Sequence, residues 1–252
     1  MAELTPMMKQ YYRLKKESGD AVLFFRLGDF YEMFEQDAKE ISSILNITLT
    51  KRNGIPMCGI PYHASQPYIA KLLQAGKKIA VCEQVSEPEA GKGIVDREIV
   101  EVITPGTVLE EDILTGNENN YLASLGIYRD ICSLSYIDCS TGDFFATSCR
   151  KSDLYERMKE EFEKNHPSEL LVQQSLIKEY PKLELYLRDK KKLLINNLPD
   201  WSFNLHESYQ RLCEHFHVLN LKAFGLEEDD PVIFSSGVLL DYLGETSRAN
   251  LN

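Results

Sequence analysis

The chain has 252 residues, 43% of them hydrophobic and 27% charged, and its net charge is −11. This composition is typical of a globular protein with a packed core, and it excludes a largely disordered chain. The sequence contains no apolar run long enough to span a bilayer and no signal peptide, so we expect a cytoplasmic protein.

The first part of the chain has the pattern of an α/β domain. A helix is predicted after Thr5, with Pro6 in its first turn and Gly19 at its end. Two strand-length apolar runs follow, and the Gly28-Asp29 pair between them suits a two-residue hairpin turn. We further expect helices at 36–46 and 65–76, extended segments at 21–27, 30–34, 47–50, 78–85 and 97–104, and an irregular Pro- and Gly-rich connection at 55–63.

The chain changes its organisation after residues 115–120, which have loop composition and no apolar period. Three consecutive strand-like runs then predict an antiparallel meander, and helices alternate with short strands beyond it. The runs are 121–128, 131–138 and 142–149; helices are expected from 152, at 204–217 and at 231–244, with short strands at 170–172 and 193–196. We therefore predict two α/β domains, 1–113 and 121–252, joined by a linker at 114–120.

Two short motifs suggest a phosphate-binding loop and a zinc site, but neither has the residues that such a site needs. The GKG sequence at 91–93 lacks both the upstream glycine and the following Ser or Thr of a phosphate-binding loop. The six cysteines form no C-x-x-C pair, and CEHFH at 213–217 is better interpreted as a buried Cys213 and a surface His217 than as a zinc site. We expect reduced thiols and no bound cofactor or metal.

A metal-dependent nuclease is the rival interpretation from another functional class. In SYIDCSTGDF (135–144), Asp138 ends a predicted strand, as the first metal-binding carboxylate does in ribonuclease-H-like nucleases. Such chemistry needs several converging carboxylates. Asp143 and Glu169 are the only further candidates, and an Asp that caps a turn accounts for the motif more simply.

RLGDFYEMFEQ (26–36) places an aromatic ring and a carboxylate two positions apart, at Phe30 and Glu32. In a strand these two side chains share one face, about 7 Å apart along the chain, whereas in a helix they diverge. The ordinary interpretation is a core Phe30 and a surface Glu32. Alternatively, an apolar ring beside a tight turn can act as a wedge between base steps of a duplex.

A wedge of this kind senses weak pairing because unstacking a base costs less where the base is mismatched. Glu32 would then hydrogen-bond the displaced base, and the nearby phosphates favour the neutral carboxyl, which can donate a hydrogen bond. Basic side chains at Lys51, Arg52 and Arg97 are candidate phosphate contacts, although each taken alone is more simply a solvated surface residue.

The sequence resembles the bacterial MutS family of DNA mismatch-repair proteins. The motifs that carry the resemblance occur in family order: TPMMKQY (5–11), LFFRLGDFYEMF (23–34), LTKR (49–52), GIPYHA (59–64), VCEQV (81–85) and ITPGT (103–107). Weaker family markers follow in the second domain, at IDCSTGDF (137–144) and HPSELL (166–171).

The resemblance implies a mixed-sheet mismatch-recognition domain followed by a ribonuclease-H-like connector domain without nuclease activity. It implies that Phe30 stacks on a mispaired base, that Glu32 bonds to that base, and that Lys51, Arg52 and Arg97 approach the DNA backbone. Family members continue into ATPase domains that bind ATP and Mg, form homodimers on mismatched duplex DNA and work with a MutL-type partner. We expect this chain to be an N-terminal, non-enzymatic fragment whose acidity is tolerated because the intact dimer encircles DNA.

Overall fold

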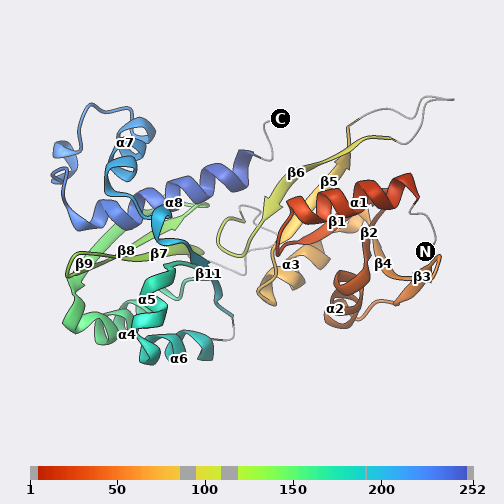
Figure 1. The fold of residues 1–252 in the computed structure, drawn as a ribbon, viewed down its shortest axis with the longest axis horizontal. Coiled ribbons are helices and arrows are strands. Elements are labelled where there is room, and N and C mark those ends of the chain that lie inside the picture. The colour runs from red at the N-terminus through yellow and green to blue at the C-terminus, as the bar shows by residue number, and fades with distance from the viewer. Residues whose placement is uncertain (1–4, 86–94, 109–118, 191, 249–252) are drawn as a thin grey trace. The chain divides into compact units, whose positions relative to one another are not determined.

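The computed structural model describes residues 5–85, 95–108, 119–190 and 192–248 (Figure 1). The chain divides into two compact units. The first comprises the residues up to Thr104 together with the end of the last helix from Thr246, and the second comprises Pro105–Glu245. Most of the predicted linker at 114–120 and the GKG sequence at 91–93 lie outside the described residues. The predicted domain limits therefore stay predictions.

The first unit is built on a six-stranded mixed sheet with strand order β3-β4-β2-β1-β5-β6 (Figure 1). The strands are β1 (Val22–Leu27), β2 (Phe30–Phe34), β3 (Thr50–Arg52), β4 (Ile55–Pro61), β5 (Ile79–Gln84) and β6 (Arg97–Ile103). The β1–β5 pair is parallel and the other four pairs are antiparallel. The sheet has one helix on one face and two helices associated with the other.

Helix α1 (Pro6–Glu17) covers one face of this sheet. Its N-terminus is capped as predicted, because the side chain of Thr5 accepts a hydrogen bond from the amide of Met8. Tyr11 is buried under the helix, and its ring meets that of Phe34 edge-on at a centroid separation of 4.9 Å. Aromatic pairs in this geometry add to the stabilisation from apolar burial.

Helix α2 (Glu35–Leu45) lies against the opposite face, and α3 (Gln66–Gln74) packs against α2. The thiol of Cys58, opposite the buried Met33 in the β2–β4 register, donates a hydrogen bond to the carbonyl of Ala38 in α2. A short 3₁₀ turn, η1 (Tyr62–Ala64), joins β4 to α3.

The segment at 55–63 was expected to be irregular, and the structure corrects this prediction: Ile55–Pro61 is strand β4. It pairs with β3 through a two-residue turn in which both Asn53 and Gly54 have positive φ, the geometry favoured by an Asn-Gly hairpin. Each of its two prolines has a paired strand on one side only, Pro56 with β3 and Pro61 with β2, so each occupies an edge-like position where a missing amide donor is tolerated. The turn signal was present in the sequence, but the prolines masked the strand.

The second unit contains a five-stranded mixed sheet with strand order β11-β10-β7-β8-β9. The strands are β7 (Tyr121–Tyr128), β8 (Ile131–Asp138), β9 (Phe144–Arg150), β10 (Glu169–Gln173) and β11 (Leu194–Leu198). Strands β7, β8 and β9 form the predicted antiparallel meander, and β10 and β11 add in parallel on the other side of β7. The predicted mixed α/β class is confirmed for both units, and the ribonuclease-H-like assignment of the second stays a prediction.

Helices cover both faces of the second sheet (Figure 1). They are α4 (Leu154–Asn165), α5 (Gln174–Glu179), α6 (Pro181–Asp189), α7 (Leu205–His215) and α8 (Pro231–Arg248), with 3₁₀ turns η2 (Lys151–Asp153), η3 (Asp200–Ser202) and η4 (Lys222–Phe224). Helices α4, α5 and α6 share one core with the sheet, and α8 contributes to the core on the opposite face. In the part of the chain that the structure describes, no helix combines the length and apolarity needed to cross a membrane.

Candidate nucleic-acid interface

A tight hairpin carries Phe30 to the surface at the start of β2. Leu27 pairs directly with Phe30, so Gly28 and Asp29 alone form the turn, as predicted. Gly28 has φ +57°, a conformation that glycine adopts without strain. The side chains alternate along β2: Tyr31 and Met33 are buried, whereas Phe30 is 46% exposed. The ring is therefore not part of the core.

Glu32 lies on the same face of β2 as Phe30. Its neighbours across the strands are Phe25 and Gly59. Gly59 leaves space beside the carboxylate, since a Cβ there would lie 3.6 Å from Glu32 Cγ and 3.3 Å from the carbonyl oxygen of Tyr31. Further along the same face, α1 covers the strand, so this face of β2 is open only at the end that carries Phe30 and Glu32.

The structure brings Arg52 to Glu32. The Arg52 guanidinium donates a hydrogen bond to Glu32 Oε2 at 2.8 Å, with side-chain exposures of 45% for Arg52 and 14% for Glu32. The ion pair joins edge strand β3 to β2 across β4. Lys51 is exposed on β3. Sequence reasoning named all three residues but gave no sign that the carboxylate and the guanidinium are partners.

Arg26 stabilises the hairpin from the face opposite Phe30 and Glu32. Nothing in the sequence indicated that Arg26 has this role. Its guanidinium donates to the Gly28 carbonyl at 2.6 Å and to the Glu83 carboxylate at 3.1 Å, and it lies 3.3 Å from the centroid of the Tyr62 ring. The hydroxyl of Tyr31 also donates to Glu83. Burial, together with this hydrogen bond, raises the pKa of Tyr31. These contacts fix the turn from which Phe30 projects.

Arg97 does not lie with the other predicted site residues. It is buried, and its guanidinium donates to the Arg26 carbonyl at 2.6 Å, to Gln10 Oε1 at 2.9 Å and to the Val95 carbonyl at 2.9 Å. Burial lowers the pKa of this guanidinium. This placement does not favour the expected contact between Arg97 and a phosphate. The guanidinium already donates its hydrogen bonds to protein acceptors around the β1–β2 hairpin.

Asp138 caps a turn. It is fully buried, and its carboxylate accepts hydrogen bonds from the Asn120 amide at 2.9 Å, the Ser140 amide at 2.9 Å and the Ser140 hydroxyl at 2.6 Å. Burial opposes ionisation, but these hydrogen bonds outweigh it and lower the pKa of Asp138. Its lone pairs are occupied by donors rather than directed at an open metal position.

Glu169 is saturated in the same way. Its carboxylate accepts hydrogen bonds from the Gly106 amide at 2.9 Å, Asn196 Nδ2 at 2.6 Å and the Tyr242 hydroxyl at 2.6 Å. Among the residues with described positions, no group of three or more His, Cys, Asp or Glu side chains is placed to hold a metal ion. The nuclease interpretation based on Asp138, Asp143 and Glu169 thus has no structural support.

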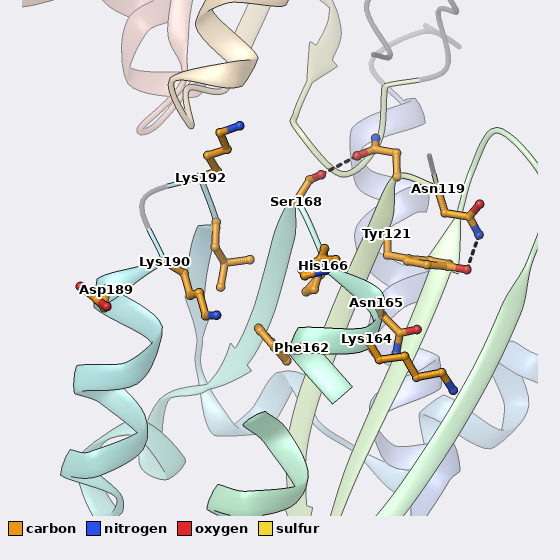
Figure 2. A pocket seen from close by; sticks show the side chains of 13 residues that line it. Asn119, Tyr121, Phe162, Lys164, Asn165, His166, Ser168, Asp189, Lys190 and Lys192 are labelled. Atoms are coloured by element: carbon orange, nitrogen blue, oxygen red, sulfur yellow. Dashed lines mark hydrogen bonds between the residues drawn. The ribbon is translucent and has the colours of Figure 1, made fainter. Parts of the chain in front are cut away.

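A hollow of about 990 Å³ lies in the second unit and contains none of the predicted site residues (Figure 2). Asn119, Asn120 and Tyr121 at the start of β7 contribute to its lining, together with the loops that precede β10 and β11. The amino groups of Lys164, Lys190 and Lys192 point in different directions and do not converge on a common point (Figure 2). We assign no ligand to this hollow.

Comparisons with known proteins give a consistent result. A family model described as MutS domain I matches residues 5–112, and one described as MutS domain II matches residues 120–252. The DNA mismatch repair protein MutS of Treponema denticola is 50% identical over 258 residues, which cover 98% of this chain and 29% of the relative. The MutS proteins of Borreliella burgdorferi and Treponema pallidum are 43% and 41% identical over 95% and 100% of the chain. The chain thus spans less than a third of the length of these relatives.

Proposed function

The chain belongs to the MutS family of DNA mismatch repair proteins, and from this premise we propose that it recognises mispaired and unpaired bases in duplex DNA. The observation that carries the proposal is the position of Phe30, an aromatic ring 46% exposed at the start of β2 and held beside a braced two-residue turn. An exposed ring next to a well-ordered turn can enter a base stack without first leaving a protein core.

The ring acts as a wedge from the minor groove. Inserting an apolar side chain between base steps costs a few kcal/mol of unstacking, and the cost is least where the bases pair badly. Discrimination therefore comes from the weakness of the duplex and not from its sequence. The Arg26 contacts support this mechanism because they hold the turn in place. A flexible turn would let the Phe30 ring move away from the base stack instead of inserting into it.

Glu32 supplies the polar contact to the displaced base. Its carboxylate is held by Arg52 in the structure, so the ion pair opens when the carboxyl turns to a base. The carboxyl group then hydrogen-bonds the displaced base. Arg52, released from Glu32, and Lys51 then meet backbone phosphates, which position the protein without reading sequence.

The net charge of −11 is compatible with this function if most of the affinity for the DNA backbone comes from other parts of a longer protein. We infer that the chain acts within such a protein, which binds ATP and Mg in ATPase domains, forms a homodimer and works with a MutL-type partner. The matched regions are MutS domains I and II and not the ATPase domain, so we propose no catalysis by the chain itself.

A competition between duplexes tests the proposal. In the full-length protein that carries this chain, the affinity ratio between a G·T-mismatched and a matched duplex is measured for Phe30→Ala by fluorescence anisotropy. Leu49→Ala is the matched control, because Leu49 is also 46% exposed. The Phe30 variant is expected to lose most of the ratio and the Leu49 variant to keep it. A Phe30→Ala variant that keeps the same affinity ratio as Leu49→Ala and the wild type would refute the wedge.

A further inference from the structure

Two cysteines face each other across neighbouring strands of the second unit. In the antiparallel register of β8 and β9, Cys132 is directly opposite Cys149. Main-chain hydrogen bonds from Lys151 to Asp130 and from Asp138 to Asp143 mark hydrogen-bonded pairs at the two ends of this ladder. Since hydrogen-bonded and non-hydrogen-bonded pairs alternate, Cys132 and Cys149 also form a hydrogen-bonded pair.

This position comes close to the geometry of a disulfide bond. The Cα atoms of a hydrogen-bonded antiparallel pair lie about 5.5 Å apart, with both side chains on the same face of the sheet. Natural disulfides span Cα separations of about 4.4–6.8 Å. The Cβ atoms of such a pair, near the upper end of about 4.5–5.5 Å, lie farther apart than the roughly 3.5–4.5 Å of natural disulfides, so closing the bond requires a small movement of the two strands and leaves a strained, readily reduced disulfide.

The surroundings make the two thiols chemically unequal. Cys132 is 2% exposed, whereas Cys149 is partly exposed on the edge strand β9. The neighbouring Cys132 thiol and nearby Arg157 lower the pKa of Cys149, whereas burial and the carboxylates of Asp153 and Glu161 act in the opposite direction. The neighbouring Cys149 thiol and burial raise the pKa of Cys132. Cys132, Cys149 and Arg157 line a cavity of about 10 Å³, the lower limit for a single water molecule.

We propose that Cys132 and Cys149 form a dithiol that reacts with hydroperoxides and closes to an intrachain disulfide. Cys149 is the attacking thiolate and Cys132 the resolving thiol. The inference rests on the β8–β9 register and is independent of the proposed role in DNA recognition.

The reaction balances with hydrogen peroxide as the oxidant. The Cys149 thiolate attacks one peroxide oxygen; the S–O bond forms, the O–O bond breaks, and the departing hydroxide takes a proton to become water. The sulfur of Cys132 then attacks the sulfenic sulfur of Cys149; the S–S bond forms, the S–O bond breaks, and the thiol proton leaves with the hydroxide as a second water. The two thiols lose two electrons in total, and the peroxide gains them.

Cys139 provides the internal control. It lies in the turn between the same two strands, and burial, followed by the charge of Asp138, raises the pKa of its thiol to about 11. It therefore has little thiolate with which to attack peroxide. Oxidation of the pair should leave Cys139 as a free thiol.

Peptide mapping under non-reducing conditions decides the matter. The reduced chain is treated with hydrogen peroxide, alkylated with iodoacetamide and cut on the N-terminal side of aspartates, which separates the three cysteines into peptides 130–137, 138–142 and 143–152. We expect the first and third peptides to be joined and the Cys139 peptide to be alkylated. Free thiols should fall from six per chain to four, and a reductant should restore them.

Two variants assign the roles. Cys132→Ser should stop the reaction at a sulfenic acid on Cys149 that dimedone captures, whereas Cys149→Ser should leave Cys132 unmodified. The second substitution is at the more exposed position, so it guards against loss of folding, which circular dichroism checks. Six remaining thiols in the wild type, a disulfide that involves Cys139, or linkage only between chains would each overturn the proposal.

Discussion

Glu32 on β2 and Arg52 on β3 form an ion pair with an N–O separation of 2.8 Å, and the carboxylate is much less exposed than the guanidinium. The two residues to which we propose different roles, one toward the base and one toward the backbone, are thus partners in the structure. In the proposed mechanism, DNA binding separates them. The energetic coupling of the pair is therefore open to measurement.

A double-mutant cycle in the full-length protein measures this coupling. In the proposed mechanism, DNA binding breaks the pair, so Arg52→Gln removes a phosphate contact but also the cost of breaking the pair; it should therefore weaken DNA binding less than it does in a Glu32→Gln background. A coupling of about 0.5–1 kcal/mol is expected for a pair with one exposed partner. Lys51→Gln, at an exposed position on the same strand, should be additive with Glu32→Gln. Strict additivity for Arg52 as well would show that the ion pair has no role in binding.

Replacement of Gly28 tests the turn that positions Phe30. Gly28→Ala places a Cβ in open space but at φ +57°, so it should lower the free energy of unfolding of the first unit by about 1 kcal/mol through backbone strain alone. Gly244→Ala is the control with the opposite sign: it also has open space but lies within α8, where alanine is favoured by about 1 kcal/mol. Urea unfolding followed by circular dichroism measures both. An unchanged midpoint for Gly28→Ala would mean that the turn relaxes.

Asp138 is predicted to stabilise the second unit and to make it sensitive to acid. Because its folded-state pKa is lowered, its contribution is complete above the unfolded pKa of about 4 and is lost as the pH falls through the folded value. Asp138→Asn places an amide among N–H donors and should cost about 1–3 kcal/mol at pH 7, with a weaker decline in stability below pH 4. Thermal unfolding between pH 3 and 7 compares the two proteins. A parallel pH dependence in both would contradict this role.

The chain by itself should bind duplex DNA weakly. Its net charge of −11 gives little counterion release, and the exposed basic residues beside Phe30 are few. Anisotropy titration of the 252-residue chain is expected to give a dissociation constant in the micromolar range or above, with a shallow salt dependence. Nanomolar, mismatch-selective binding by the chain alone would show that its own surface supplies the affinity.

The sequence supported the placement of Phe30 and Glu32 because two local signals agreed. The period of two along 30–34 predicts a strand, and the Gly28-Asp29 pair predicts the hairpin that exposes its first residue. Both signals act over a few residues and need no tertiary information. The same local logic predicted the meander of β7, β8 and β9.

Other features depended on contacts between distant residues and left no local sign. The stacking of Arg26 on Tyr62 and the burial of Arg97 follow from how β1, β6 and η1 meet, so neither could be predicted from the sequence. Helices α5 and α6 were not predicted because Pro181 divides the segment into two helices too short to show a clear period. Strand β4 was missed because its prolines resemble those of a loop.

The most direct test of the wedge is the state of the base that it unstacks. A duplex carries 2-aminopurine at the mispaired position, where fluorescence rises when the base leaves the stack, and the full-length protein is added to saturation. The wild type and Leu49→Ala are expected to raise the fluorescence several-fold, and Phe30→Ala, when fully bound, should leave it near the level of free DNA. An equal rise with Phe30→Ala would show that another part of the protein opens the stack.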